Sequence, residues 1–431
     1  MDDAIGTPSP GHAPALRFAA LRVPPYRRYF VVNLLSMTAD NMEHVISYWV
    51  IFQAFHSPAL AGFAVISHWV PFLLFSLHAS ALADRYDCRK LIQISQGLFM
   101  LASLAWGVLF LTGALQMWHA VVILLVHGAA GVVGAPASQL MIHDMVPRAK
   151  LASAIRLNAT SRYLAILLGP AVGGGLMLLL GPAWGLLTNV LVYLPFSLFV
   201  RRVPYTGHAD GSGRVGSPGF TTIAGALMNA RLEPRIMTMI TLAGASSFFV
   251  GNAFQAQMPG FAQLLGADDT GARYSILLAA NAAGAILGVL LLEGANILRP
   301  SVRTAIVCAG LWGVTMGLFP MAQSYQTAVA LLVLAGVFSI TFTSMAQTLV
   351  QILAPVGRRG SVVGLFNTAM LGLRAGSGLT VGVLGTFIGI RLSLELSSLM
   401  VVLTAIALFG LDARARRERD GAALVSEGTS A

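Results

Sequence analysis

The feature that most constrains this chain is a series of long apolar segments separated by short polar connections. The segments 60–83 and 91–112, for example, are predominantly apolar, and each exceeds the length of about 20 residues that a bilayer crossing requires. Charged residues make up only 10% of the chain, against about 25% in soluble globular proteins. So few charges cannot cover a water-exposed surface. The sequence therefore predicts an all-α membrane protein.

We predict twelve transmembrane helices, which an even number of crossings and the distribution of basic residues both favour. Of the 27 Lys and Arg residues, Arg162 and Arg374 fall deep inside predicted spans, and Arg273 and Arg391 lie at span ends on one side. The other 23 lie toward the opposite side, which includes both termini, with Arg156 and Arg303 just inside the ends of their spans. Because basic residues mark the cytoplasmic side, we expect both termini in the cytoplasm. The predicted spans are 29–54, 60–83, 91–112, 117–142, 151–179, 183–200, 236–261, 271–294, 302–322, 327–352, 361–389 and 392–411.

The net charge of +10 is explained by this topology and by contact with anionic lipid, so we expect no nucleic-acid partner. Residues 1–28 are polar and lack the apolar core of a secretory signal. We therefore expect an integral protein of a bacterial-type cytoplasmic (inner) membrane, whose first span acts as its own insertion signal.

A polar, Gly/Ser/Pro-rich stretch, 201–220, divides the spans into six and six. The two sets look alike, because 139–147 aligns with 347–355 at a constant offset of 208 residues. Such a duplication is typical of transporters that hold their substrate at the midplane between two halves. We predict two pseudo-symmetric six-helix halves, with this division of the chain: cytoplasmic tail 1–28, first half 29–200, cytoplasmic linker with a surface helix 201–235, second half 236–411 and cytoplasmic tail 412–431.

A charged loop between the second and third spans carries a recognisable motif. Residues 80–90 read Ser-Ala-Leu-Ala-Asp-Arg-Tyr-Asp-Cys-Arg-Lys. They resemble the Gly-x-Leu-Ala-Asp-Arg-x-Gly-Arg-Arg/Lys loop of major facilitator superfamily transporters, although Ser80 and Asp87 replace the two glycines. The resemblance implies that the matching charged residues act in the conformational switch of the transport cycle: Asp84, Arg85, Arg89 and Lys90.

The fifth predicted span resembles a motif of the exporting, proton-antiporting branches of the same superfamily. Gly169, Pro170, Gly173 and Gly174 match Gly-x-x-x-Gly-Pro-x-x-Gly-Gly, with an alanine in place of the first glycine. Residues 145–158 resemble the corresponding segment of multidrug and siderophore exporters of the enterobactin and macrolide type. The resemblance implies a proton-coupled exporter of drug- or siderophore-like organic molecules. Small residues at a helix contact are the structural alternative.

Ionisable residues cluster in the first predicted span. Asp40, Glu43 and His44 are spaced by three and four positions, so they share one helical face. Ionisable groups inside a membrane are costly and suggest function. We predict a proton-binding site that faces the substrate cavity, with the choice between Asp40 and Glu43 as proton carrier left open. A structural hydrogen-bond cluster is the alternative.

Other polar residues in the predicted spans are candidates for the cavity. We expect Asp40 to pair with Arg162, since both lie near the middle of the bilayer, with Arg374 as the competing cation. His68, His78 and His119 are interpreted as isolated structural histidines. The further cavity candidates are Asn158, His127, Asn252, Gln255 and Gln347.

A divalent-metal transporter is the alternative function. Asp40, Met42 and His44 resemble the first span of ferroportin-type iron exporters and offer carboxylate, thioether and imidazole ligands. The chain has no ATP-binding motif and no paired catalytic residues, so we expect neither an enzyme nor a cofactor. We expect a monomer in the lipid bilayer, which exchanges protons for a small-molecule substrate by alternating access.

Overall fold

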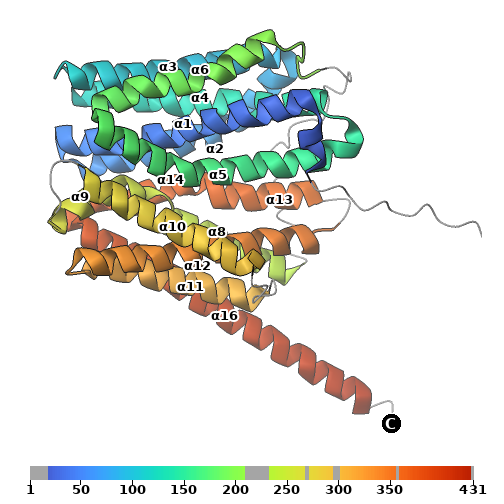
Figure 1. Cartoon of the computed structure of the whole chain (residues 1–431). Coiled ribbons are helices and arrows are strands. Elements are labelled where there is room, and N and C mark those ends of the chain that lie inside the picture. Colours follow the sequence, from blue (N-terminus) through green and yellow to red (C-terminus); the bar gives the residue numbers. More distant parts are fainter. Residues whose placement is uncertain (1–17, 209–232, 267–270, 295–300, 356–358, 429–431) are drawn as a thin grey trace, which may run out of the picture.

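The structure is a computed structural model that describes residues 18–208, 233–266, 271–294, 301–355 and 359–428. Within these residues all regular secondary structure is helical, with no β-strand (Figure 1). This agrees with the prediction of an all-α protein. Most of the predicted linker, with the surface helix that we assigned to it, lies outside the described residues.

The first group of helices follows a short 3₁₀ helix, η1 (Ala19–Arg22). Its members are α1 (Pro24–Phe55), α2 (Pro58–Arg85), α3 (Cys88–Leu111), α4 (Met117–Met145), α5 (Arg148–Leu180) and α6 (Pro182–Arg202). In this group α1 packs against α5 and α6, α3 packs against α4 and α6, and α2 packs against α4. The group forms the upper part of the molecule in Figure 1.

The second group contains more interruptions. Its members are α8 (Pro234–Phe249), α9 (Ala253–Leu264), α10 (Ala272–Gly294), α11 (Val302–Leu318), η2 (Phe319–Met321), α12 (Tyr325–Leu353), α13 (Arg359–Asn367), α14 (Arg374–Ser377), α15 (Leu384–Ile388) and α16 (Ile390–Gly428). Here α12 packs against α10 and α11, and α11 packs against α16. Its helices form the lower part of the molecule, and the end of α16 extends beyond the bundle (Figure 1).

In the described parts of the chain, 11 segments are long and apolar enough to cross a membrane. All twelve predicted spans coincide with helical segments. The one that is not among the 11 is α1, whose hydropathy is lowered by Asp40, Asn41, Glu43 and His44. Because α1 packs against α5 and α6, neighbouring helices rather than lipid can receive its polar side chains.

The predicted span 236–261 is not one continuous helix. It breaks between α8 and α9 at Gly251, which has a φ of +42°, a conformation that glycine adopts without steric cost. The carbonyl of Ser246 accepts hydrogen bonds from both Val250 N and Gly251 N at the break. The predicted span 361–389 is likewise interrupted by two π-helical segments, Thr368–Gly372 and Gly378–Val383. Such wider turns are frequent at functional sites.

The two groups meet closely at the end of the molecule where α1 connects to α2. A Cβ atom added to Gly62 would lie 2.7 Å from Gly382 Cα, so only glycine permits this approach of α2 to the second π-helical segment. Nearby, Gln257 Nε2 donates to the carbonyl of Pro58 at 2.8 Å, and Tyr274 Oη donates to the carbonyl of Val45 at 2.8 Å. Backbone contact of this kind is how helices associate in lipid.

Candidate substrate cavity and ion site

A cavity of about 360 Å³ lies between the two helix groups. Both groups line it, the first with residues of α1 to α6 and the second with residues of α8 to α12, of α14 and of the π-helical segment Thr368–Gly372. Its walls combine aromatic and polar side chains. The aromatic ones are Tyr48, Trp69, Phe72, Phe99, Phe196, Phe254, Trp312 and Phe342, and the polar ones include Asn33, Ser36, Gln96, Asn158, Asn252, Gln255, Asn281 and Thr343.

Most of the charged residues predicted for the cavity do line it. Asp40 and Arg162 come from the first group, and Arg374 comes from the second. Arg374 lies between the two π-helical segments, and its guanidinium carbon is 5.1 Å from the centre of the Trp69 ring. This is a cation–π distance between a helix of each group.

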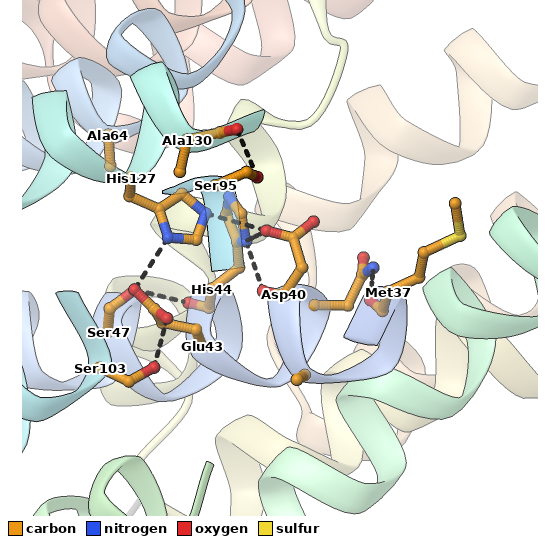
Figure 2. A network of polar contacts seen from close by, with 12 residues as sticks. Met37, Asp40, Glu43, His44, Ser47, Ala64, Ser95, Ser103, His127 and Ala130 are labelled. Atoms are coloured by element: carbon orange, nitrogen blue, oxygen red, sulfur yellow. Dashed lines mark hydrogen bonds and ion pairs between the residues drawn. The ribbon is translucent and has the colours of Figure 1, made fainter. Parts of the chain in front are cut away.

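His127 bridges the two carboxylates of α1. Its Nε2 lies 2.9 Å from Asp40 Oδ1 and its Nδ1 lies 2.8 Å from Glu43 Oε1. Figure 2 shows the imidazole reaching from α4 into the space between the two acidic side chains. When both carboxylates are ionised, both ring nitrogens must carry hydrogen, since a carboxylate only accepts hydrogen bonds. Asp40, His127 and Glu43 can thus hold a shared proton inside the membrane.

Glu43 is the buried end of this bridge. Its side chain is 2% exposed, against 28% for Asp40. Ser103 Oγ donates a hydrogen bond to Glu43 Oε2, and Asn189 Nδ2 donates to Ser103 Oγ and to the carbonyl of Ala39. The Glu43 carboxylate is therefore fixed by side chains of α3 and α6 on the side away from the cavity, whereas the Asp40 carboxylate lines the cavity.

Two further histidines complete the cluster. The ring of His44 lies 4.7 Å from that of His68 and 4.8 Å from that of His127, measured between centroids. His44 Nδ1 is 2.7 Å from the carbonyl of Asp40 on the preceding turn. His68 Nδ1 is a buried atom without a hydrogen-bond partner among the described residues. His68, which we interpreted as an isolated histidine, therefore belongs to the site.

The glycines of α5 position α1 so that the face with Asp40 and His44 points to the cavity. Gly169 lies against Asn41 and Gly173 lies against Met42, so α5 packs on the side of α1 that is away from Asp40 and His44. Positions two apart on an α-helix are separated by roughly 200°. For that reason Met42, which is 1% exposed, does not join Asp40 and His44 in the cavity. The ligand set that the sequence suggested for a metal is not assembled.

The other predicted cavity residues divide between lining and non-lining positions. Asn158, Asn252 and Gln255 line the cavity, as does Pro170 of the span-5 motif, whereas Gln347 on α12 and His127 on α4 do not. Asn33 Nδ2 donates to Asn158 Oδ1 at 3.2 Å, which links α1 to α5. The described partners of the Asp40 carboxylate are His127 at 2.9 Å and His44 at 3.7 Å. Pairing of Asp40 with Arg162 stays a prediction.

The charged loop between α2 and α3 is held together by its own side chains. Asp87 caps α3 by accepting from Arg89 N, and Arg89 Nη2 donates to Asp87 Oδ2 at 2.7 Å. The hydrogen bond from Arg89 lowers the pKa of the Asp87 carboxyl below its usual value. Asp87, which stands where the family motif has glycine, thus acts as the N-cap of α3.

The chain segment after α6 lies across this loop. Arg89 Nη1 donates to the carbonyl of Val203, Cys88 N donates to the carbonyl of Thr206, and His208 Nε2 is 3.1 Å from the carbonyl of Asp84. These contacts tie the end of the first helix group to the α2–α3 loop. The side chains of Arg85 and Lys90 are exposed at this surface.

The helical fold and the polar cavity between two helix groups suit a membrane transporter. The family model described as "Transmembrane secretion effector" matches residues 15–426. The chain therefore belongs to this family of major facilitator transporters and is not an enzyme, in agreement with the sequence prediction.

Solved structures show the same fold at low sequence identity. A bacterial homologue of the human lysosomal transporter Spinster, inward-facing and unoccupied, superposes with a TM-score of 0.68 at 15% identity, covering 92% of this chain and 98% of that chain. The nucleoside transporter NupG gives 0.69 at 12% identity, with 90% and 98% covered. A D-xylose–proton symporter gives 0.62 at 15% identity, with 91% and 97% covered.

One curated relative has a sequence match. The staphyloferrin A transporter of Staphylococcus aureus (strain NCTC 8325 / PS 47) is 22% identical over 184 residues, which is 41% of this chain and 46% of that protein. The match spans about half the length of the relative.

Proposed function

We propose that the protein is a proton-coupled exporter of amphipathic organic molecules that works by alternating access. The observation that carries the proposal is the cavity between the two helix groups, in whose wall Asp40 is bridged through His127 to the buried Glu43. In this proposal α1 also crosses the membrane, which raises the number of spans from 11 to twelve. The two groups are then the pseudo-symmetric six-helix halves. The cavity would open alternately to the two sides of the membrane as the groups rock against each other.

The lining supports an amphipathic substrate with an acidic group. The cavity volume of about 360 Å³ lies in the range of roughly 300–1,000 Å³ that is usual for small-molecule sites. Aromatic side chains would contact the apolar part of the substrate, and Arg162 and Arg374 would contact an anionic part. Because the curated relative is a staphyloferrin A transporter, we propose the siderophore class first and anionic drugs second.

Protons are the proposed coupling ion. The chain carries no ATP-binding motif, and its span-5 glycine motif resembles that of proton-antiporting exporters. The bridged pair Asp40 and Glu43, with Arg162 in the same cavity, would bind the proton that is exchanged for substrate. We further propose an inner-membrane monomer with both termini in the cytoplasm.

Divalent-metal transport is the second candidate, because His44 and Asp40 lie together in the cavity wall. Its predicted third ligand, Met42, packs against α5 instead. This geometry favours an organic substrate as the transported molecule.

Reconstituted liposomes provide the test. With an acidic lumen, outward proton flow should drive accumulation of a labelled siderophore or anionic drug, and a protonophore should abolish it. Glu43→Gln should lose the response to the pH gradient, whereas the exposed control His78→Gln should transport like wild type. Accumulation of substrate that is unchanged by the protonophore would refute proton coupling. Failure of the whole siderophore and drug panel, with metal uptake instead, would refute the organic substrate.

A further inference from the structure

Three histidines and an aspartate on three helices form a cluster with the composition of a metal site. Asp40 and His44 come from α1, His68 from α2 and His127 from α4, and one ligand atom from each lies within 4.8 Å of the others. We infer that this cluster binds a divalent transition-metal ion of the class that prefers imidazole ligands, with Zn²⁺ as its representative. The ligand set replaces the one that the sequence suggested.

The donor types determine the class of ion. Three imidazole nitrogens and one carboxylate oxygen suit Zn²⁺, Co²⁺, Ni²⁺ and related ions, whereas Mg²⁺ and Ca²⁺ require mostly oxygen ligands. In a tetrahedral site with bonds of about 2.0–2.1 Å, ligand atoms are about 3.3 Å apart. The present separations reach 4.8 Å. Rotation of the side chains on fixed helices can close a gap of this size.

Hydrogen bonds already orient two of the histidines for metal binding. His44 Nδ1 lies 2.7 Å from the carbonyl of Asp40. A carbonyl only accepts, so Nδ1 must carry the hydrogen, which leaves Nε2 as the ligand atom. His127 Nδ1 faces Glu43, and Glu43 is held by Ser103, so His127 Nε2 is the ligand atom. An ion there would take the place of the hydrogen between Nε2 and Asp40 Oδ1. The result is the carboxylate–histidine–metal arrangement that fixes ring orientation in known metal sites.

His68 gives independent evidence for a missing ligand. Its Nδ1 is buried and has no hydrogen-bond partner among the described residues, although buried polar atoms are nearly always paired. Its ring centre lies 5.6 Å from that of His127 and 4.7 Å from that of His44. A bound ion among these rings would give the His68 imidazole the partner that the described residues do not provide.

Access and charge also fit a cation. The side chains of Asp40 and His44 are 28% and 21% exposed and line the cavity, so an ion can reach them from there. Asp40 as a ligand and Glu43 behind His127 place two carboxylates around the ion. These carboxylates offset the positive charge of the ion and its repulsion by Arg374, which lines the same cavity. The site depends on these contacts alone and not on which organic molecule the cavity carries.

Binding to the purified full-length transporter tests the inference directly. ZnCl₂ should raise the temperature of unfolding and MgCl₂ should not. CoCl₂ should give visible absorption bands of four-coordinate Co²⁺, which Zn²⁺ removes by competition. His68→Gln and His44→Gln should each weaken Zn²⁺ binding about tenfold or more, and Glu43→Gln should weaken it by about 10–100-fold, since it supports a ligand.

His78→Gln is the matched control, because His78 lies on the same helix as His68 but is exposed. It should bind Zn²⁺ like wild type. Wild-type protein without Co²⁺ bands and without stabilisation by Zn²⁺ would overturn the inference, whatever the folding of the variants. Equal losses in His78→Gln and His68→Gln would also overturn it. Neither result would affect proton-driven transport of an organic substrate, so the two proposals can fail separately.

Discussion

His127 shows at the residue scale how one side chain makes two intramembrane carboxylates tolerable. An isolated ion in a low-dielectric interior is strongly destabilised, and a hydrogen-bonded partner of opposite charge offsets much of that cost. His127 contacts both acids of α1, and Ser103 and Asn189 satisfy the far side of Glu43. The polar groups of α1 are thus paired with those of α3, α4 and α6 before any substrate binds.

Removing the donor behind Glu43 should cost stability. In Ser103→Ala the Glu43 carboxylate loses the hydrogen bond from Ser103, and a bond to a charged group contributes about 1.5–3 kcal/mol. We expect the free energy of unfolding in mixed micelles to fall by about that amount. Ser95→Ala, which removes a neutral bond to the Ala130 carbonyl, should cost only about 1 kcal/mol. Equal losses would mean that Glu43 is not held as a charged group.

Interruptions of the helices determine the site at the element scale. The break at Gly251 and the two π-helical segments lie on the second-group helices that line the cavity. They place Asn252 at a helix end and Arg374 between two wider turns. On the first group, the glycines of α5 bring that helix onto α1. Small residues thus decide which face of each helix reaches the cavity.

Gly62 should be required for close packing of the two groups. A side chain in Gly62→Leu would meet the backbone of Gly382, and overpacking of this kind costs about 1–3 kcal/mol. That energy would raise the equilibrium constant for separating the two groups at this end of the molecule by roughly 5–150-fold. Maleimide labelling of Ala61→Cys in detergent should accelerate in the Gly62→Leu background. Gly97→Leu is the control, since nothing lies within 4 Å of a Cβ there; equal acceleration by both would refute the role of Gly62.

The α2–α3 loop should act on the rate of transport and not on substrate affinity. Asp84 lies at the end of α2, where His208 reaches its carbonyl, and it is absent from the cavity lining. In Asp84→Asn we expect maximal transport to fall about fivefold, the effect of about 1 kcal/mol on one conformational step. Equilibrium binding of substrate should be unchanged. Glu233→Gln, a partly exposed acid elsewhere, should alter neither quantity; a large loss of binding in Asp84→Asn would contradict this role.

Two helix groups with a polar cavity between them form the transporter at the scale of the whole molecule. The described contacts between Gly62 and Gly382, Gln257 and Pro58, and Tyr274 and Val45 all lie toward one end of the bundle. Rocking of one group on the other requires such contacts to form and separate. In such a cycle these contacts would exchange together with the others between the groups, such as that of Arg374 with Trp69.

Topology should follow the basic residues. With 23 of 27 Lys and Arg residues on one side, we expect reporters fused to either terminus to be active in the cytoplasm. Reporters inserted at 113–116, between α3 and α4, should be active outside. A C-terminal reporter that is active outside would exclude twelve spans, because the two termini would then lie on opposite sides.

The sequence by itself determined the helical membrane class, the agreement of the predicted spans with helical segments and the clustering of Asp40, Glu43 and His44 on one face of α1. These follow from hydropathy and from the 3.6-residue period, which are local properties of the chain. The partners of those residues were set by tertiary structure. His127 was a candidate from α4, but His68, Ser103 and Asn189 lie on other helices, and their positions in the sequence carry no sign of a shared site.

The same division explains what the sequence did not predict. Hydropathy predicted the span 236–261 but not its interruption, because the break depends on a positive φ at Gly251 that few of the described glycines adopt. Met42 was grouped with Asp40 and His44 by proximity in sequence, whereas the packing of α5 on α1 assigns it to the opposite side. Spacing along the chain fixes the angle between side chains on a helix, but the neighbouring helices decide which angle faces the cavity. That choice belongs to the tertiary structure because it depends on contacts between residues distant in sequence.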